Sequence, residues 1–257
     1  MTAFRIECAA ATDTGRVRDL NEDSYLARPD LGLWLVADGM GGHHAGDFAS
    51  RTVVDELDRL EPAASAPALL TALEERVIHA NALLRQAARE RGGSGLIGCT
   101  IAALVIFGGA YACVWSGDSR IYRVRQGVAE QVTRDHTEAQ ELVDRGTLTP
   151  DEAKSWPRRN VVTRAIGVFD EPELEMVQGR VEDGDVFVLC SDGLTQHVED
   201  DEIGRMANLR PLRRAVDELI ATTLARGAKD NVTVVAVACR EVTALRSGGP
   251  GQDRGDA

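Results

Sequence analysis

Three aspartates stand where an apolar run suited to a buried strand meets polar sequence, namely Asp38, Asp192 and Asp230. The first two are each followed by glycine, and the third precedes the apolar run 232–238. Carboxylates that gather at strand ends repel one another unless a cation lies among them. Oxygen-only ligands favour Mg²⁺ or Mn²⁺ over zinc. The pattern therefore predicts a site for a hard divalent metal ion.

The residues after Asp38 favour a ligand over a simple turn. An Asp-Gly pair alone is more often a turn, because both residues tolerate left-handed backbone angles. After Asp38, however, three of the next four residues are glycine and no returning strand follows. Glycines allow the backbone to approach an ion or an anion closely.

Further charged residues lie in short polar segments between strand patterns. Asp118 is a candidate ligand, or alternatively the acid of a hairpin turn. Glu22 and Asp23 are a fifth and a sixth acid, and Arg18 precedes Glu22 by four residues. A guanidinium beside clustered acids is ordinarily their salt-bridge partner. The alternative is a bidentate clamp for a phosphate group.

The elements that must position these residues are mostly strands. Strand patterns occur at residues 4–12, 23–28, 32–38, 98–107, 110–116, 119–125, 128–133, 174–179, 185–191 and 231–239. Helical periodicity occurs at 46–60, with Phe48, Val53, Leu57 and Leu60 on one side, and at 66–91 and 211–227. The polar segment 135–160 has short helical patterns and no strand pattern, which is typical of an insertion or lid.

The order of these elements predicts an α+β fold. Strands come mostly in adjacent antiparallel hairpins and helices come in pairs, which argues against a doubly wound βαβ arrangement. We expect a sandwich of two mainly antiparallel sheets with helix pairs outside, as four layers α-β-β-α. We expect one domain at 1–240. The glycine-rich, charged segment 241–257 is predicted to be a flexible tail.

The composition excludes some partners. The chain has 29 basic and 41 acidic residues and a net charge of -12, which argues against a general nucleic-acid or anionic-membrane surface. The start MTAFRIECAA lacks the features of a signal peptide, so we expect a cytoplasmic protein. The uncharged stretch 96–116 contains Gly108-Gly109 and predicts a buried hairpin, not a membrane span. The five scattered cysteines predict reduced, buried thiols.

With these features in place, the chain resembles the bacterial branch of the metal-dependent protein phosphatases, the PPM or type 2C serine/threonine family, from about residue 12 to residue 238. The matching segments occur in the order found in that family. They are TGRVRDLNEDS, LVADGMGGHHAGDFAS, GCT at 98–100, SGDSRIY, TRDHT, RRNVVTRAIG, FVLCSDGL and KDNVTVVAV.

The resemblance implies a set of metal ligands. Asp38 is expected to bridge two Mn²⁺ or Mg²⁺ ions, with the Gly39 carbonyl on one of them. Asp192 and Asp230 are expected to complete the other, and Glu22 to reach the second either directly or through a water molecule. Asp118, with Asp192, corresponds to the ligands of the third ion of bacterial members.

The resemblance also implies roles for residues around the ions. Arg18 corresponds to the arginine that binds the substrate phosphate. Asp23 and Asn231 fall at positions that orient the ligands. Residues from about 134 to 167 resemble the flap that borders the cleft and influences substrate choice.

The implied activity is hydrolysis of phosphoserine and phosphothreonine in proteins. Two ions bind and activate a bridging water, which attacks phosphorus in line with the leaving oxygen, so no phosphoenzyme forms. The expected substrate is a phosphoprotein, such as a eukaryotic-like serine/threonine kinase or its targets in bacterial signalling. A monomer is the default expectation.

Two positions depart from the family pattern. Animal members carry a histidine, assigned as the general acid, where this chain has Met40, and methionine donates no proton. His43 and His44 are the nearby alternatives. Many bacterial relatives have His-Pro in the flap where this chain has Trp156-Pro157, so we expect a different substrate preference.

Two rival hypotheses remain. Aspartyl-nucleophile phosphatases need Asp-x-Asp directly after a strand, but Asp183-Gly184-Asp185 precedes its strand. A catalytically silent phosphoprotein-binding module of the same fold would lack ligands, yet none of the three strand-end aspartates is missing.

Overall fold

The computed structural model describes residues 3–42, 45–91 and 96–242. Its strands are β1 (Phe4–Asp13), β2 (Asp23–Arg28), β3 (Leu33–Gly41), β4 (Ile97–Cys99), β5 (Ile101–Phe107), β6 (Ala110–Ser116), β7 (Arg120–Arg125), β8 (Val128–Gln131), β9 (Glu175–Arg180), β10 (Val186–Cys190) and β11 (Val232–Glu241). Its helices are α1 (Ala45–Asp58), α2 (Ala66–Glu90), α3 (Glu138–Asp144), α4 (Pro150–Lys154), α5 (Asp192–Thr195), α6 (Asp200–Met206) and α7 (Leu212–Ala225).

The strands form two sheets. One has the order β1-β11-β10-β7-β8, and the other has the order β2-β3-β5-β6-β9, with β4 paired to β3. Each strand pair in the described residues is antiparallel. The β5–β6 hairpin turns at Gly108 and Gly109, both with positive φ, as the glycine pair in the uncharged stretch predicted.

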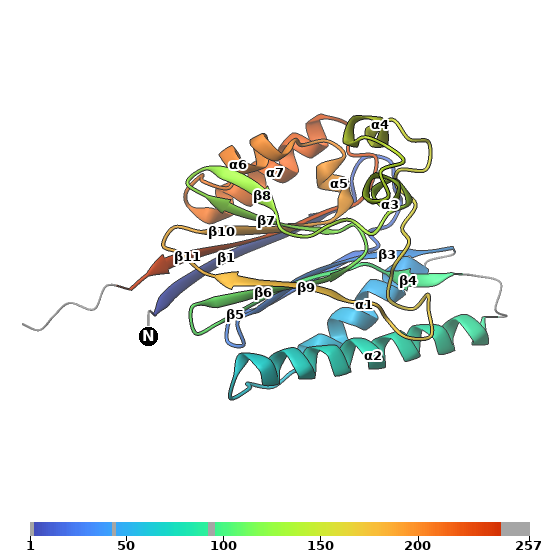
Figure 1. The fold of residues 1–257 in the computed structure, drawn as a ribbon, viewed down its shortest axis with the longest axis horizontal. Helices are drawn as coiled ribbons and strands as arrows, with labels where there is room; N and C mark the ends of the chain where they lie inside the picture. The colour runs from blue at the N-terminus through green and yellow to red at the C-terminus, as the bar shows by residue number, and fades with distance from the viewer. Residues whose placement is uncertain (1–2, 43–44, 92–95, 243–257) are drawn as a thin grey trace, which may run out of the picture.

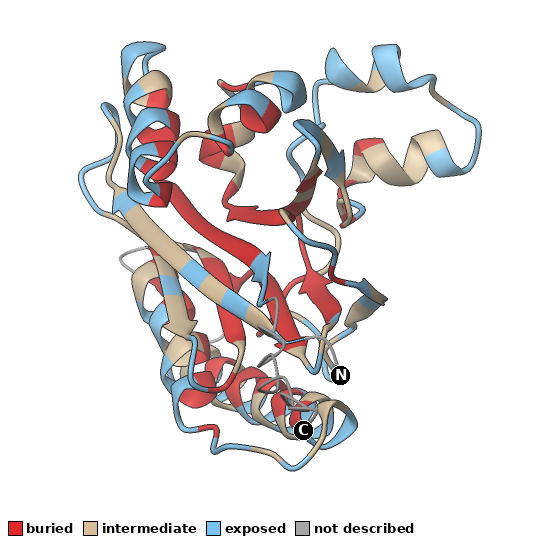
Figure 2. Ribbon diagram, turned by 90° about the vertical axis from the view of Figure 1, so that its left-hand side faces the viewer, coloured by how far each residue is buried: buried red, intermediate tan, exposed pale blue. Residues whose placement is uncertain are grey.

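The sheets pack face to face and helices cover both outer faces, so the predicted four-layer sandwich is confirmed (Figure 1). Helices α1 and α2 lie on the sheet that contains β3, and α6 and α7 lie on the sheet that contains β11. Three apolar clusters fill the three interfaces between layers. The middle cluster contains Trp34 and Phe187, both fully buried. Figure 2 shows that burial concentrates along the central strands.

The structure corrects several details of the sequence prediction. Strand β3 does not end at Asp38, because residues 39–41 pair with β4. The predicted strand 98–107 is two strands, separated at Thr100. Phe48, expected on the apolar side of its helix, is 39% exposed. The helices α5 and α6 begin at Asp192 and Asp200, where no helix was expected.

The predicted insertion contains the short helices α3 and α4, which lie together at one end of the molecule (Figure 1). The domain boundary at 240 stays a prediction, since β11 reaches Glu241 and the rest of the tail, from 243, lies outside the described residues. All five cysteines are free thiols, and only Cys8 is not fully buried. Within the described ranges, no helix is long and apolar enough to cross a membrane.

Candidate metal centre

The two sheets bring the predicted acids together from separate strands. Asp23 on β2 pairs directly with Asp38 on β3. Asp192 begins α5, immediately after β10 and Ser191, and Asp230 lies two residues before β11. Since β10 and β11 are neighbours in the other sheet, the acids face one another across the sandwich.

Asp38 is the acid most strongly affected by the others. Its pKa is raised well above the usual range, first by burial and then by the charges of Asp23, Asp192, Asp118 and Asp230. Its backbone N–H donates to the Thr100 hydroxyl at 3.1 Å. A carboxylate that four other acids surround is unfavourable as an anion unless a cation joins them. The donor set therefore suits a hard divalent ion.

Asp118 lies between β6 and β7 and is 8% exposed. Its pKa is also raised well above the usual range, by burial first and then by Asp192 and Asp135. The adjacent Ser119 hydroxyl is 2.7 Å from the Thr100 hydroxyl. Thr100 thus links the segment that carries Asp118 to the strand that carries Asp38.

Asp192 occupies the first position of α5. Burial and the charge of Asp230 raise its pKa to about 6, against a hydrogen bond from Gln196 that lowers it. The Gln196 side-chain amide donates to Asp192 Oδ2 at 2.7 Å. One turn of helix therefore fixes the orientation of this carboxylate.

Glu22 and the Gly39 carbonyl border a small space above Gly46 of α1. A Cβ on Gly46 would lie 2.5 Å from Glu22 Oε1 and 2.7 Å from the Gly39 oxygen. The Gly46 N–H also donates to Glu22 Oε1 at 3.1 Å. Two oxygens directed at a space that only glycine leaves open are suited to a cation. Both groups are among the ligands that the resemblance implies, and their assignment to particular ions stays a prediction.

Asp23 connects the two sheets. Its Oδ2 accepts hydrogen bonds from the Ser191 and Thr233 hydroxyls, each at 2.7 Å. Burial raises the pKa of Asp23 to about 7, while these two hydrogen bonds lower it. Asp23 is 7% exposed. From inside the sandwich it therefore joins β2 to Thr233 in the other sheet and to Ser191, which directly follows β10 of that sheet.

Arg18 lies at the edge of the cluster. Its Nη2 donates to Asp230 Oδ2 at 2.9 Å, and its side chain is 51% exposed. That hydrogen bond and the charges of Asp230, Glu22 and Asp38 raise the Arg18 pKa. Both sequence hypotheses for Arg18 remain compatible with this geometry, because the ion pair uses one nitrogen and leaves the guanidinium accessible to a phosphate.

The acids do not form a closed metal cage. Among the described residues, no three His, Cys, Asp or Glu side chains have the geometry to hold a metal ion. Several of the carboxylates instead accept hydrogen bonds from protein donors. Mg²⁺ keeps several waters and is commonly held by one or two carboxylates. The residues therefore fit ions whose coordination is completed by carbonyl groups and water.

Sequence reasoning missed several supporting residues, namely Thr100, Ser119, Ser191, Gln196 and Thr233. Each acts through a hydrogen bond to a residue that is distant in sequence, or that lies in a helix not expected. The Ser and Thr residues lie inside the matching motifs, which is the only signal that pointed to them.

The two departures from the family pattern lie on β3 and in the flap. Met40 lies on β3, two residues after Asp38, while His43 and His44 lie outside the described residues. Trp156 Nε1 donates to Glu138 at 3.1 Å, which ties the two halves of the flap together. The His136 N–H donates to the Gly117 carbonyl at 2.9 Å, so the flap begins beside Asp118.

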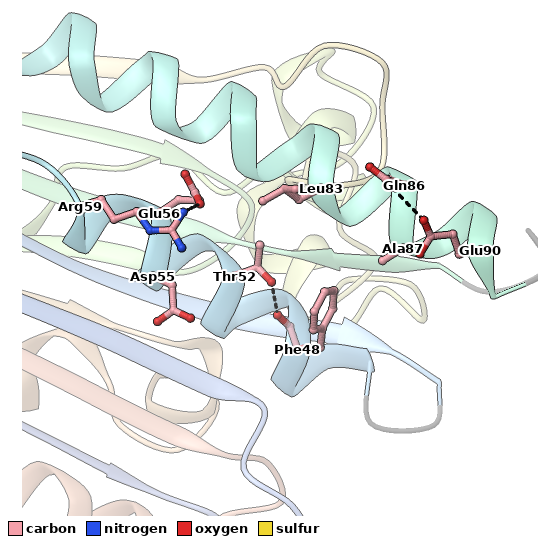
Figure 3. Close-up of a pocket in the computed structure, with 9 residues that line it drawn as sticks. All are labelled: Phe48, Thr52, Asp55, Glu56, Arg59, Leu83, Gln86, Ala87 and Glu90. Atoms are coloured by element: carbon pink, nitrogen blue, oxygen red, sulfur yellow. Dashed lines mark hydrogen bonds and ion pairs between the residues drawn. The ribbon is translucent and has the colours of Figure 1, made fainter.

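A surface groove lies away from these acids, between α1 and α2 (Figure 3). It is lined by Phe48, Thr52, Asp55, Glu56, Arg59, Leu83, Gln86, Ala87 and Glu90. None of the predicted site residues lines it. We place the site at the acidic cluster, because that is where the mutually repelling carboxylates lie.

The chain is similar to known bacterial protein phosphatases. The serine/threonine protein phosphatase PstP of Mycobacterium tuberculosis is 40% identical over 229 residues, which cover 88% of this chain and 44% of that protein. The chain thus spans under half the length of this relative. The serine/threonine phosphatase stp of Listeria monocytogenes is 32% identical over 236 residues, which cover 88% of this chain and 93% of that protein.

Two solved structures have the same fold. PppA of Pseudomonas aeruginosa, described as a regulatory component of T6SS, superposes with a TM-score of 0.85 and 42% identity over 92% of this chain and 98% of that one. The PstP catalytic domain in complex with two manganese ions superposes with a TM-score of 0.82 and 35% identity, over 93% and 100% of the two chains. The family model described as protein phosphatase 2C matches residues 15–234. The chain therefore belongs to the protein phosphatase 2C family.

Proposed function

We propose that this protein is a metal-dependent phosphatase that hydrolyses phosphoserine and phosphothreonine in proteins. The observation that carries the proposal is the cluster of carboxylates around Asp38, whose charges act together with burial to raise the pKa of Asp38. Family membership and the two manganese ions of the PstP structure support it.

In this proposal, Asp38 and the Gly39 carbonyl hold Mn²⁺ or Mg²⁺ together with Glu22, Asp192 and Asp230. Asp118 and Asp192 would hold a third ion. When bound, the ions supply an activated water and neutralise phosphate charge.

The protein groups position the reaction around the phosphate. Arg18 binds phosphate oxygens with the part of its guanidinium that Asp230 leaves free. Asp23 and Asn231 hold the ligands in place. One bond forms between water oxygen and phosphorus as the bond to the serine or threonine oxygen breaks, and that oxygen takes a proton. Met40 does not donate this proton, and we assign the role of proton donor to a water molecule.

The test is hydrolysis of a phosphothreonine peptide by the purified chain with Mn²⁺, with EDTA, and by Asp38→Asn. We expect hydrolysis that needs Mn²⁺ and that falls by about a thousandfold or more in the variant, by analogy with removal of a main catalytic group. Hydrolysis that survives both changes would exclude the proposal. Phosphopeptide binding without any hydrolysis would favour the silent module.

The partners and the cellular setting also remain proposals. We infer a phosphoprotein substrate, either a serine/threonine kinase or a target of one, and action as a monomer in the cytoplasm. The names of the relatives, which include serine/threonine phosphatases of several bacteria, support the substrate class. Comparison of phosphoproteomes with and without the gene would identify the substrate, and light scattering of the purified protein would give its mass.

A further inference from the structure

The side-chain amide of Asn231 uses both of its N–H donors and its oxygen acceptor in hydrogen bonds to the backbone around one loop. It is 5% exposed. Its amide nitrogen donates to the carbonyl oxygens of Thr14 at 2.9 Å and Leu20 at 2.8 Å. Its side-chain oxygen accepts the backbone N–H of Glu22 at 2.8 Å. We call residues 14–20 the arginine loop, because Arg18 lies within it.

The two carbonyl groups lie at the two ends of the arginine loop, so one buried side chain closes its base. The start of the loop also packs against the segment before β11. The Arg16 N–H donates to the Ala228 carbonyl at 2.8 Å. Gly15 has φ +81°, and a Cβ there would lie 2.2 Å from the Asp230 carbonyl oxygen. The base of the loop is thus fixed by hydrogen bonds and by a close backbone contact.

The rest of the arginine loop has little burial to hold it. Val17 is 65% exposed and Leu20 is 41% exposed. Apolar burial is the main force that orders a segment, and a loop without it must be ordered by its hydrogen bonds. The conformation of the loop therefore depends on the clamp at its base, and the position of Arg18 depends on this clamp together with the ion pair to Asp230.

The side chain of Asn231 has a role separate from that of its backbone. The backbone N–H of Asn231 donates to Asp230 Oδ1 at 2.9 Å, which orients that carboxylate. Any residue other than proline can make this bond. A substitution of the side chain therefore removes the clamp on the loop and leaves the bond to Asp230 in place.

We propose that Asn231 is a positioning residue for Arg18, whose side chain clamps the arginine loop so that the guanidinium stays where a substrate phosphate binds. This inference rests on the proposed function, in which Arg18 contacts that phosphate. Without the clamp, the loop would populate conformations in which Arg18 is elsewhere. Affinity falls in proportion to the fraction of molecules in the binding conformation.

The chain offers a matched control in Asn81 of α2, which is 2% exposed. Its amide nitrogen donates to the Phe169 and Asp170 carbonyls at 3.1 and 3.2 Å, and its oxygen accepts the Gly167 N–H at 2.6 Å. Asn81 therefore makes the same kind of clamp on another loop. Replacing it removes equivalent hydrogen bonds and leaves the arginine loop untouched.

The first measurement is hydrogen exchange of the metal-free protein in EDTA, for the wild type, Asn231→Ala and Asn81→Ala. We expect amides of the arginine loop to exchange at least about tenfold faster in Asn231→Ala, as expected when buried hydrogen bonds are lost. Asn81→Ala should change only residues 167–170 and their neighbours. Unchanged exchange in the arginine loop would overturn the clamp. If Asn231→Ala does not fold, Asn231→Ser is measured under the same criterion.

The second measurement separates positioning of Arg18 from general damage. KM for a phosphothreonine peptide with Mn²⁺ is compared among the wild type, Asn231→Ala, Arg18→Ala and the double variant. We expect Asn231→Ala to raise KM about tenfold, as removal of a supporting residue typically does. In the Arg18→Ala background, the Asn231→Ala substitution should raise KM by less than about a further twofold. If the two substitutions raised KM independently, so that the increase in the double variant equalled the product of the single increases, the positioning role would be overturned.

The two measurements fail independently of each other. If the wild type hydrolyses no phosphopeptide, the proposed function fails, and hydrogen exchange of the metal-free protein still tests the clamp. If hydrolysis is normal and the exchange of the arginine loop does not depend on Asn231, the inference fails and the proposed function stands.

Discussion

Ionisation of Asp192 should make the metal-free protein less stable as the pH rises. Burial and the charge of Asp230 raise the pKa of this carboxyl group from 3.8 to about 6 in the folded protein. Between these two values the folded state keeps a proton that the unfolded chain has released. The free energy of unfolding therefore falls with increasing pH through this window.

The size of the effect follows from the two pKa values. A difference of roughly two units corresponds to about 3 kcal/mol in total, at about 1.4 kcal/mol per unit. Nearly half of it, about 1.4 kcal/mol, falls between about pH 5 and about pH 7.5, because the unfolded carboxyl is already ionised at the lower pH. A divalent ion binds the ionised form, so Mn²⁺ should offset the loss.

The assay is urea denaturation in EDTA at both pH values, for the wild type and Asp192→Asn. The pKa values of His136 and His197 are lowered mainly by burial. These two groups therefore make the folded protein more stable as the pH rises, which opposes the effect of Asp192. Subtracting the variant from the wild type cancels both histidines. We expect the wild-type free energy of unfolding to fall relative to that of the variant by at least about 1.4 kcal/mol at the higher pH, because the Asp192 charge also raises the pKa values of Asp23, Asp38 and Asp118 in the wild type. A difference that stays constant, or that moves in favour of the wild type, would refute the reasoning.

Three further predictions concern the space for the ions, the flap and the core. Gly46→Ala should lower Mn²⁺ affinity about tenfold, since its Cβ would enter the space beside Glu22 Oε1 and the Gly39 oxygen. Gly42→Ala is the control in a calorimetric titration with Mn²⁺, because no atom of the described residues lies within 4 Å of a Cβ at that position. Equal affinities of the two variants would contradict the prediction. Arg120→Gln should speed hydrogen exchange of the flap, because the bidentate pair of Arg120 with Asp135 holds the flap to β7. Arg125 also lies on β7 and makes a similar bidentate pair with Asp185. Arg125→Gln breaks that pair and should leave hydrogen exchange of the flap unchanged. An equal effect of both arginines on the flap would argue against this anchor. Phe187→Ala should cost about 3–5 kcal/mol in urea denaturation, because the ring is fully buried between the sheets and lies 4.9 Å from the Tyr111 ring. A loss below about 1 kcal/mol would show that the middle cluster repacks.

The sequence predicted most of the fold because period-two patterns and glycine turns are local signals. Details were wrong where tertiary contacts decide. Strand β3 continues through Asp38 and Gly39, since β4 pairs with the residues that follow. Phe48 is apolar and has the right spacing, yet it lies at the surface, with the Arg91 guanidinium 5.4 Å from its ring.

The acids of the site could be located from sequence because three apolar runs border an aspartate. Their arrangement could not be predicted in the same way. Thr100 accepts the backbone N–H of Asp38 and bonds to the hydroxyl of Ser119, next to Asp118. Ser191 and Thr233 donate to Asp23, and all of these bonds join residues far apart in the chain. Such bonds leave no periodic pattern. The ion pair of Arg18 with Asp230 was one of two open hypotheses, and only the folded geometry showed it.

The central claim is that the carboxylates around Asp38 bind divalent cations. Calorimetric titration of Mn²⁺ into the metal-free protein and into Asp38→Asn tests it most directly, because it depends on no substrate. We predict that the wild type binds at least two ions, as the PstP structure contains, and that the variant loses one or more of them. Binding of no ion by the wild type, or identical titrations of the two proteins, would contradict the account.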